Sequence, residues 1–117
     1  SVGIKLVHGE NSFVMCGDAS EESESAMVKR FGSALECDVL KCGHHGSRTS
    51  TSEVFLKATN PTWAVISCGV DNSYGHPHQE TLERLNNDDV QVYRTDLLGT
   101  IIATSDGTNI SWFSEKE

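Results

Sequence analysis

Short apolar runs alternate with helix-like segments along this chain, and the alternation restricts the folds that it can adopt. Four runs have the length and apolar content of buried strands: 13–16, 37–42, 63–68 and 90–95. Three helix-like segments separate these runs: 20–32, 51–59 and 77–87. A repeated strand-helix-strand order predicts an α/β fold, in which a mixed β-sheet carries about three helices packed on it.

The two ends of the chain extend this plan. Residues 4–8 alternate like a strand and are predicted to form a hairpin with 13–16, with Glu10 and Asn11 at the turn. Three closing strands are predicted near the other end: 90–95, 99–104 and 109–113. Asp106 and Gly107 suit the turn between the last two. No internal repeat or low-complexity linker divides the 117 residues, which are interpreted as one unit.

Capping signals locate the helices. The first helix is predicted from Ser20, with its inward face formed by Ala26, Met27 and Phe31 and its end at Gly32. Its first turn carries three acidic residues that favour the positive helix end: Glu21, Glu22 and Glu24.

The next two helices have start signals of their own. Ser50 and Glu53 fit a capping box for a helix that begins at Thr51, and Asn60 and Pro61 end it. Pro77 suits the first position of the third helix.

Charge and cysteine content narrow the function. The formal net charge of −8 argues against passive nucleic-acid binding through a basic face, but it permits an enzyme that reaches a phosphodiester through metal ions. The four cysteines form no C-x-x-C pair and lie in apolar runs, so they are interpreted as small buried hydrophobes. No apolar run approaches the ~20 residues needed to cross a bilayer.

Three polar clusters each follow an apolar strand: Gly17–Asp18, Gly43–His44–His45–Gly46–Ser47 and Tyr74–Gly75–His76–Pro77–His78. Functional groups gather beyond the carboxyl ends of strands in open α/β sheets. Carboxylate and imidazole together suit zinc, manganese or iron. Each cluster also has a simpler interpretation, since Asp18 suits a helix cap and the histidines suit hydrogen bonds to backbone. Their common position after strands favours a shared site.

These clusters resemble motifs of the metallo-β-lactamase superfamily. A strand ending in Gly17–Asp18, the stretch from Asp38 through His44–His45–Gly46–Ser47, and Asn72 through His78 are similar to the branch that includes the C-terminal domain of ComEC-type DNA-uptake proteins. The superfamily's H-x-H-x-D-H motif is absent from this sequence. The resemblance therefore implies that residues 1–117 form a single, partial domain: the second half of an αββα sandwich, with the N-terminal half missing.

The resemblance also implies roles for individual residues. Asp18 would bridge two divalent metal ions, zinc or manganese, and His76 would be the histidine ligand. His44 and His45 would be catalytic, stabilising an oxyanion or protonating a leaving group; the reversed assignment, with the histidine pair as ligand, stays open. Contacts to substrate are expected from four further side chains: Ser47, Thr49, Ser50 and His78. This chain alone is expected to hold metal weakly or not at all, because the shell is incomplete.

The implied function is metal-dependent hydrolysis of a phosphodiester, linked to DNA uptake in competence. The alternatives are an esterase or lactonase on the same fold, or a degenerate module that binds without catalysis. The expected partners are the missing N-terminal half, a DNA or other phosphodiester substrate, and a second copy that covers the exposed sheet face. The implied location is an extracytoplasmic domain of a bacterial membrane protein.

Overall fold

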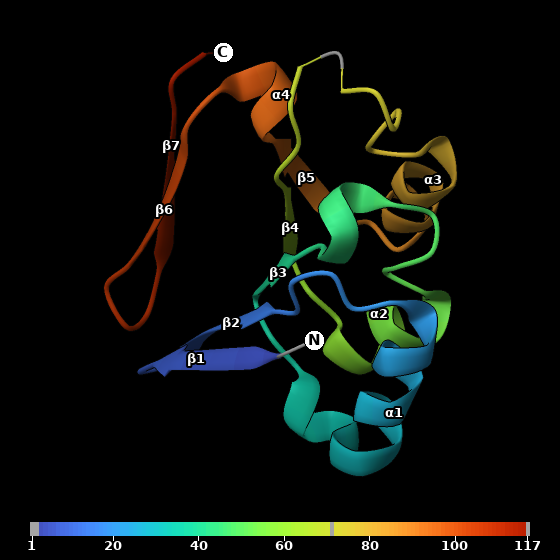
Figure 1. Cartoon of the computed structure of the whole chain (residues 1–117). Coiled ribbons are helices and arrows are strands. Elements are labelled where there is room, and N and C mark those ends of the chain that lie inside the picture. Colours follow the sequence, from blue (N-terminus) through green and yellow to red (C-terminus); the bar gives the residue numbers. More distant parts are fainter. Residues whose placement is uncertain (1–2, 71, 117) are drawn as a thin grey trace.

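The computed structural model describes residues 3–70 and 72–116, and its centre is a five-stranded mixed sheet (Figure 1). The strands neighbour one another in chain order: β1 (Ile4–His8), β2 (Asn11–Met15), β3 (Val39–Lys41), β4 (Trp63–Ile66) and β5 (Gln91–Arg94). The pair β1–β2 is antiparallel, and β2 to β5 are parallel. The predicted α/β class with a mixed sheet is confirmed.

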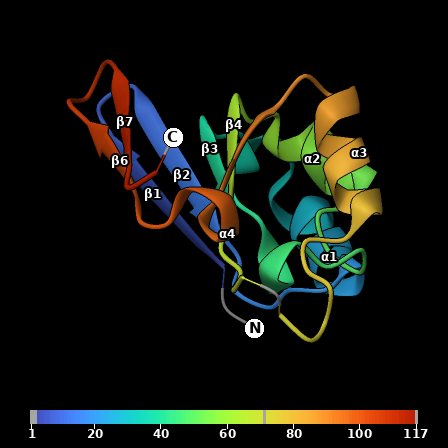
Figure 2. The ribbon, with the colours of Figure 1, turned by 90° about the horizontal axis from the view of Figure 1, so that it is seen from above.

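Three helices connect the parallel strands and cover one face of the sheet (Figure 2). They are α1 (Glu21–Phe31), α2 (Glu53–Thr59) and α3 (Gln79–Asn87). Three shorter turns complete the helical structure: η1 (Gly32–Leu35), η2 (Gly43–Gly46) and α4 (Thr95–Leu98). No helix in the described part of the chain is both long and apolar enough to span a membrane.

The sheet face under these helices forms the core. Val14, Leu40 and Ala64 are aligned across β2, β3 and β4, and all three are buried. Phe55 of α2 and Leu85 of α3 pack into the same cluster and are also buried. Burial of such side chains contributes roughly 1.5–3 kcal/mol each, so this layer holds the loops at the strand ends in place.

All three predicted closing strands form, and the turn at Asp106 and Gly107 lies between the last two as predicted, but the last two strands do not join the five-stranded sheet. Of the three, β5 joins the sheet by pairing with β4. The other two, β6 (Ile101–Ser105) and β7 (Ile110–Ser114), form a separate hairpin against the opposite face (Figure 2). The short helix α4, absent from the sequence prediction, follows β5 directly, and Gly99 ends it with a positive φ of 71°. This turn directs the chain away from the sheet edge.

Contacts at the middle of the hairpin and at its tip explain its position. The Trp112 ring stacks on Tyr93 with centroids 4.2 Å apart and lies 5.7 Å from Trp63. At the tip, the Glu10 N–H donates to the Gly107 carbonyl over 2.6 Å. The His8 Nδ1 is 2.9 Å from the hydroxyl of Ser105. Apolar contact and tip-to-tip hydrogen bonds thus replace pairing at the β5 edge.

The inward face of α1 also differs from the prediction. Ala26 and Phe31 are exposed, while Glu24 is fully buried and Met27 and Val28 pack against the core. Residues 24, 27 and 28 share one helix face by their spacing. The Glu24 carboxylate accepts the N–H groups of residues 51 and 52 at 2.6 and 2.9 Å, which turns this face inward.

Several predicted boundaries shift by one or two residues. The N-cap of α2 is Ser52, whose hydroxyl accepts the Phe55 N–H, and the predicted Ser50–Glu53 box does not form. Helix α3 begins at Gln79 with His78 as its N-cap, so Pro77 precedes the helix. The first hairpin turns one residue earlier than predicted, because Asn11 already pairs with His8.

Candidate functional site

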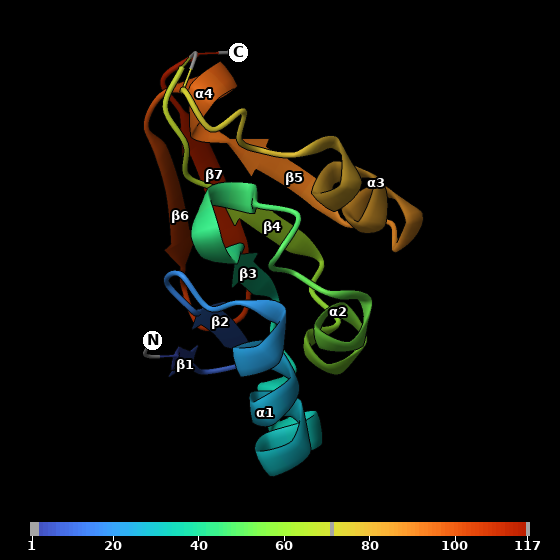
Figure 3. The same ribbon diagram turned by 45° about the vertical axis from the view of Figure 1, so that its right-hand side comes forward.

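The three polar clusters meet at the carboxyl ends of β2, β3 and β4, because these strands are parallel neighbours (Figure 3). Backbone hydrogen bonds join the loops to one another. The His44 N–H donates to the Gly17 carbonyl over 2.8 Å, and the His78 N–H donates to the Gly46 carbonyl over 3.0 Å. The sequence prediction that these clusters lie together is confirmed at the level of the backbone.

Two glycines allow this close approach. A Cβ at Gly43 would lie 3.2 Å from the Ala19 carbonyl oxygen. A Cβ at Gly46 would lie 2.7 Å from the Cβ of Pro77, closer than non-bonded carbons approach, and Gly46 also has a positive φ of 81°. The loop that holds the histidine pair therefore requires glycine at position 46 and has little room for a side chain at position 43.

The histidine pair itself lies in an uncommon backbone conformation. His44 and His45 have φ values of 51° and 54°, so η2 is a left-handed turn rather than a right-handed helix. Residues other than glycine rarely adopt this region, at a cost of order 1–3 kcal/mol each, and such residues cluster at functional sites. The His45 Nδ1–H donates to the Ser67 carbonyl over 2.7 Å and helps to hold the turn.

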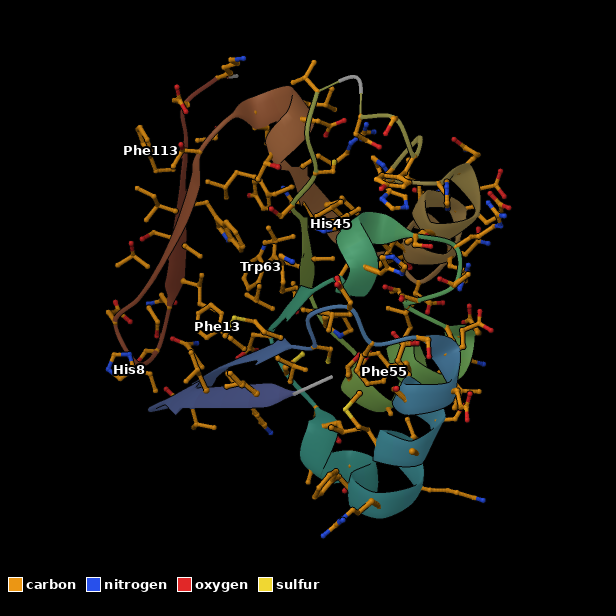
Figure 4. The ribbon with its side chains drawn as sticks, viewed as in Figure 1. His8, Phe13, His45, Phe55, Trp63 and Phe113 are labelled. Carbon is orange, nitrogen blue, oxygen red and sulfur yellow. The ribbon has the colours of Figure 1, made fainter. Side chains whose placement is uncertain are left out.

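Four imidazole rings gather at this edge, with His76 at the centre; one of them, His45, is labelled in Figure 4. The centroid of the His76 ring is 5.6 Å from that of His44, 6.2 Å from that of His45 and 4.8 Å from that of His78. Burial, followed by the charge of these neighbours, lowers the pKa of His76 below its ordinary value. His76 is therefore neutral at neutral pH, which is the form that binds metal.

The hydrogen bonds of the four histidine rings determine which ring nitrogens remain free to bind a metal or transfer a proton. His78 uses both nitrogens, since Nδ1 accepts the Arg48 N–H at 2.9 Å and Nε2–H donates to the Tyr74 carbonyl at 3.1 Å. His45 donates from Nδ1, which leaves the lone pair on Nε2 free. A ring that donates one N–H to a carbonyl and presents the other nitrogen is typical of metal-ligating histidine.

Within residues 3–70 and 72–116, no hydrogen bond engages the ring nitrogens of His44 or His76 or the exposed carboxylate of Asp18. These groups are the types of donor that zinc and manganese take. Across the same residues, no group of three or more histidine, cysteine, aspartate or glutamate side chains is arranged to hold a metal ion. The donors fit a metal site, but they form only a part of its shell.

The predicted substrate-contacting residues occupy different positions. Ser47 is buried, and its hydroxyl bonds with the Thr49 hydroxyl over 2.9 Å. Ser50 is fully buried and donates to the Ala19 carbonyl, while Thr49 is exposed. In this structure the two serines and His78 hold the loops together through hydrogen bonds. A contact with substrate stays a prediction for all four residues, of which only Thr49 is exposed.

Sequence reasoning assigned no role to Asn72, which holds the His76 backbone from both sides. Its Oδ1 accepts the His76 N–H over 2.8 Å, and its Nδ2 donates to the His76 carbonyl over 2.7 Å and to the Gly69 carbonyl over 3.0 Å. The tendency of asparagine to bond nearby backbone in loops that contain glycine is the signal that would have found it.

No family model matches the chain. It is 43% identical over 93 residues to ComE operon protein 3 of Bacillus subtilis (strain 168), covering 80% of this chain and 12% of that protein. It is 38% identical over 98 residues to competence protein ComA of Neisseria gonorrhoeae, covering 84% of this chain and 14% of that protein. It is 39% identical over 93 residues to recombination protein 2 of Haemophilus influenzae, covering 80% of this chain and 11% of that protein.

The match thus takes in most of this chain but less than a sixth of each relative. The mixed α/β unit with its histidine-lined edge is homologous to one segment shared by these bacterial proteins, one of which is named a competence protein.

Proposed function

We propose that this chain forms one half of a metal-dependent phosphodiesterase site that acts in competence, the uptake of DNA. The observation that carries the proposal is the convergence of Asp18, the left-handed His44–His45 turn and His76 at one edge of the sheet. The relative named as a competence protein supports the biological setting. The resemblance to metallo-β-lactamase motifs supports the reaction class.

Asp18 and His76 would hold divalent metal, zinc or manganese, and the free Nε2 of His45 makes it the third candidate ligand. A bound metal supplies hydroxide near neutral pH, because it lowers the pKa of its water. His44 lies beside His76 with both ring nitrogens free of partners among the described residues, so it would carry a proton to the leaving group.

One observation favours a second candidate, a module that binds substrate without catalysis. The described residues provide no group of three metal-binding side chains, so this chain by itself lacks a full shell. The proposed hydrolase therefore needs further ligands from a second segment, which the resemblance places upstream, in a domain outside the cytoplasm. A lesion in that segment would leave only the binding module.

The test joins this chain to that upstream segment and measures bound metal and the metal-dependent cleavage of a DNA oligonucleotide. Replacement of Asp18 by asparagine is expected to lower the rate more than about 100-fold, because loss of a first ligand exceeds the 10–100-fold cost of an outer partner. Glu22→Gln, on the exposed side of α1, is the matched control and should leave the rate unchanged.

A joined protein that binds two metals and cleaves a carboxylic ester, but not the oligonucleotide, would replace the phosphodiesterase by the esterase alternative. A joined protein that holds no metal would leave the binding module.

We also propose that the sheet face opposite the helices associates with a second copy when the upstream segment is absent. A hollow of about 510 Å³ lies between this face and the hairpin, lined by apolar side chains that include Leu6, Phe13 and Val65. Sedimentation across a series of concentrations is expected to show a dimer that Val65→Lys disrupts. A monomer at every concentration would contradict this association.

A further inference from the structure

One exposed aromatic side chain borders the histidine cluster. Tyr74, in the loop between β4 and α3, is 76% exposed, the highest value among the large apolar and aromatic residues within 3–70 and 72–116. Its ring lies 5.7 Å from that of His76 with the planes only 21° apart. The His45 ring is also nearly parallel to that of His76, with centroids 6.2 Å apart and the planes 20° apart. The exposure of the Tyr74 ring directly beside the histidine cluster needs an explanation.

The loop that carries Tyr74 is fixed at several points. The Tyr74 carbonyl accepts the His78 Nε2–H over 3.1 Å, and the same ring accepts the Arg48 N–H on its other nitrogen. Asn72 closes the loop through its hydrogen bonds to both sides of His76. Because these bonds order the backbone before any ligand arrives, Tyr74 presents its ring at little further cost in conformational entropy.

A small pocket opens beside the ring. It has a volume of about 190 Å³ and is lined by residues of two loops, the one after β3 and the one between β4 and α3: His45, Cys68, Gly69, Asn72, Tyr74 and His76. Pockets for whole drug-sized ligands start near ~300 Å³. The pocket therefore has the size of one flat ring, which would lie next to His45 and His76.

The charge of the chain bears on how a nucleic acid would be held here. With nine Lys and Arg residues against 17 Asp and Glu, the protein offers little attraction to a phosphate backbone. A protein that binds single strands under these conditions must obtain its affinity from the bases, and stacking on aromatic side chains is sequence-tolerant and independent of charge.

We propose that Tyr74 is a stacking platform for a nucleobase of single-stranded DNA, and that it positions the adjoining phosphodiester at the histidine cluster. The proposal rests on the proposed function and names the substrate of that site. A base in the pocket would bury the exposed ring against a partner of the same flat shape.

Fluorescence anisotropy with the full chain and a labelled oligo-dT strand tests the platform. Tyr74→Leu removes the aromatic face at similar size and is expected to weaken binding by about 5- to 100-fold, while Tyr74→Phe stays within about two-fold. Phe113→Leu, an equally simple change at an exposed aromatic residue of the hairpin, should have no effect. An abasic strand of the same length keeps its phosphates, so its binding should be insensitive to Tyr74→Leu.

Two results would overturn the proposal: absence of oligo-dT binding by the unaltered chain, or equal binding by the unaltered chain and Tyr74→Leu. Circular dichroism of each variant ensures that a loss is not a loss of fold. Tyr74-dependent binding without metal-dependent cleavage in the joined protein would reject the proposed function alone. Cleavage with binding that ignores Tyr74 would reject the platform alone.

Discussion

The two faces of the five-stranded sheet are built from the same strands but are covered in different ways (Figures 2 and 4). Under the helices, Leu40, Ala64 and Ile66 are at most 1% exposed. On the opposite face, Phe13 and Val65 are only partly buried, and the hairpin leaves a hollow above them. Alternating side chains of one strand therefore enter two different environments.

The two faces therefore differ in how much they contribute to the stability of the unit. The helices pack closely against the buried side chains of β2, β3 and β4, so that side supplies most of the packing energy. The hairpin contacts the sheet mainly through the aromatic group of Trp63, Tyr93 and Trp112. The indole N–H of Trp112 is buried there without a hydrogen-bond partner among the described residues.

The largest expected effect is on the helix-covered face. Leu40→Ala should lower the free energy of unfolding by about 2–5 kcal/mol, because it leaves a cavity in a close-packed layer. Leu6→Ala, the same chemical change at a side chain 52% exposed on the other side, should cost about 1 kcal/mol or less. Urea unfolding of both variants measures the contrast, and equal losses would break the comparison.

The second effect concerns the buried carboxylate of the helix-covered side. Glu24→Gln should cost about 1–3 kcal/mol, since an amide accepts from one of the two N–H donors and turns its own NH₂ toward the other. The control Glu22→Gln, at an exposed position of α1, should change stability by less than about 0.5 kcal/mol.

The difference in stability between the native chain and Glu24→Gln is expected to depend on pH with a definite sign. Burial raises the pKa of the Glu24 carboxyl above 4.5, and the N–H donors of Ser52 and Thr51 oppose this. The folded state thus retains the proton on Glu24 to higher pH than the unfolded state. The contribution of this protonation to the free energy of unfolding is therefore present below pH 4.5 and is lost as pH rises through the folded-state pKa of Glu24. The gap between the native chain and Glu24→Gln should narrow as pH rises. A gap that widens would show a lowered pKa instead.

The smallest effect is expected under the hairpin. Trp112→Phe removes the buried N–H without a partner and keeps a ring against Tyr93, so relief of the polar group offsets the lost area to within about 1 kcal/mol. Thermal unfolding gives the value. A loss above about 2 kcal/mol would mean that the indole N–H is paired in solution and that the hairpin side is as well ordered as the helix side.

Local patterns were sufficient for much of the fold and for the composition of the site. Apolar runs separated by caps predicted the strand and helix order, and the position of Asp18, His44 and His76 after strands predicted their common edge. The burial of Glu24 was missed, because a glutamate in a first helical turn usually faces water. The hydrogen-bond partners of Glu24 are Thr51 and Ser52, which lie 27 and 28 positions further along the chain.

The sequence by itself determined the α/β class, the helices and the residue types gathered beyond the strands, because these follow from periodicity and capping within a few residues. Only the tertiary structure decided that β6 and β7 leave the sheet, that His78 has no free nitrogen and that Tyr74 stands exposed beside His76. The hairpin is held by contacts with residues far from it in sequence, and the Nδ1 of His78 is occupied by the Arg48 N–H from 30 positions away, so no local pattern encodes either feature.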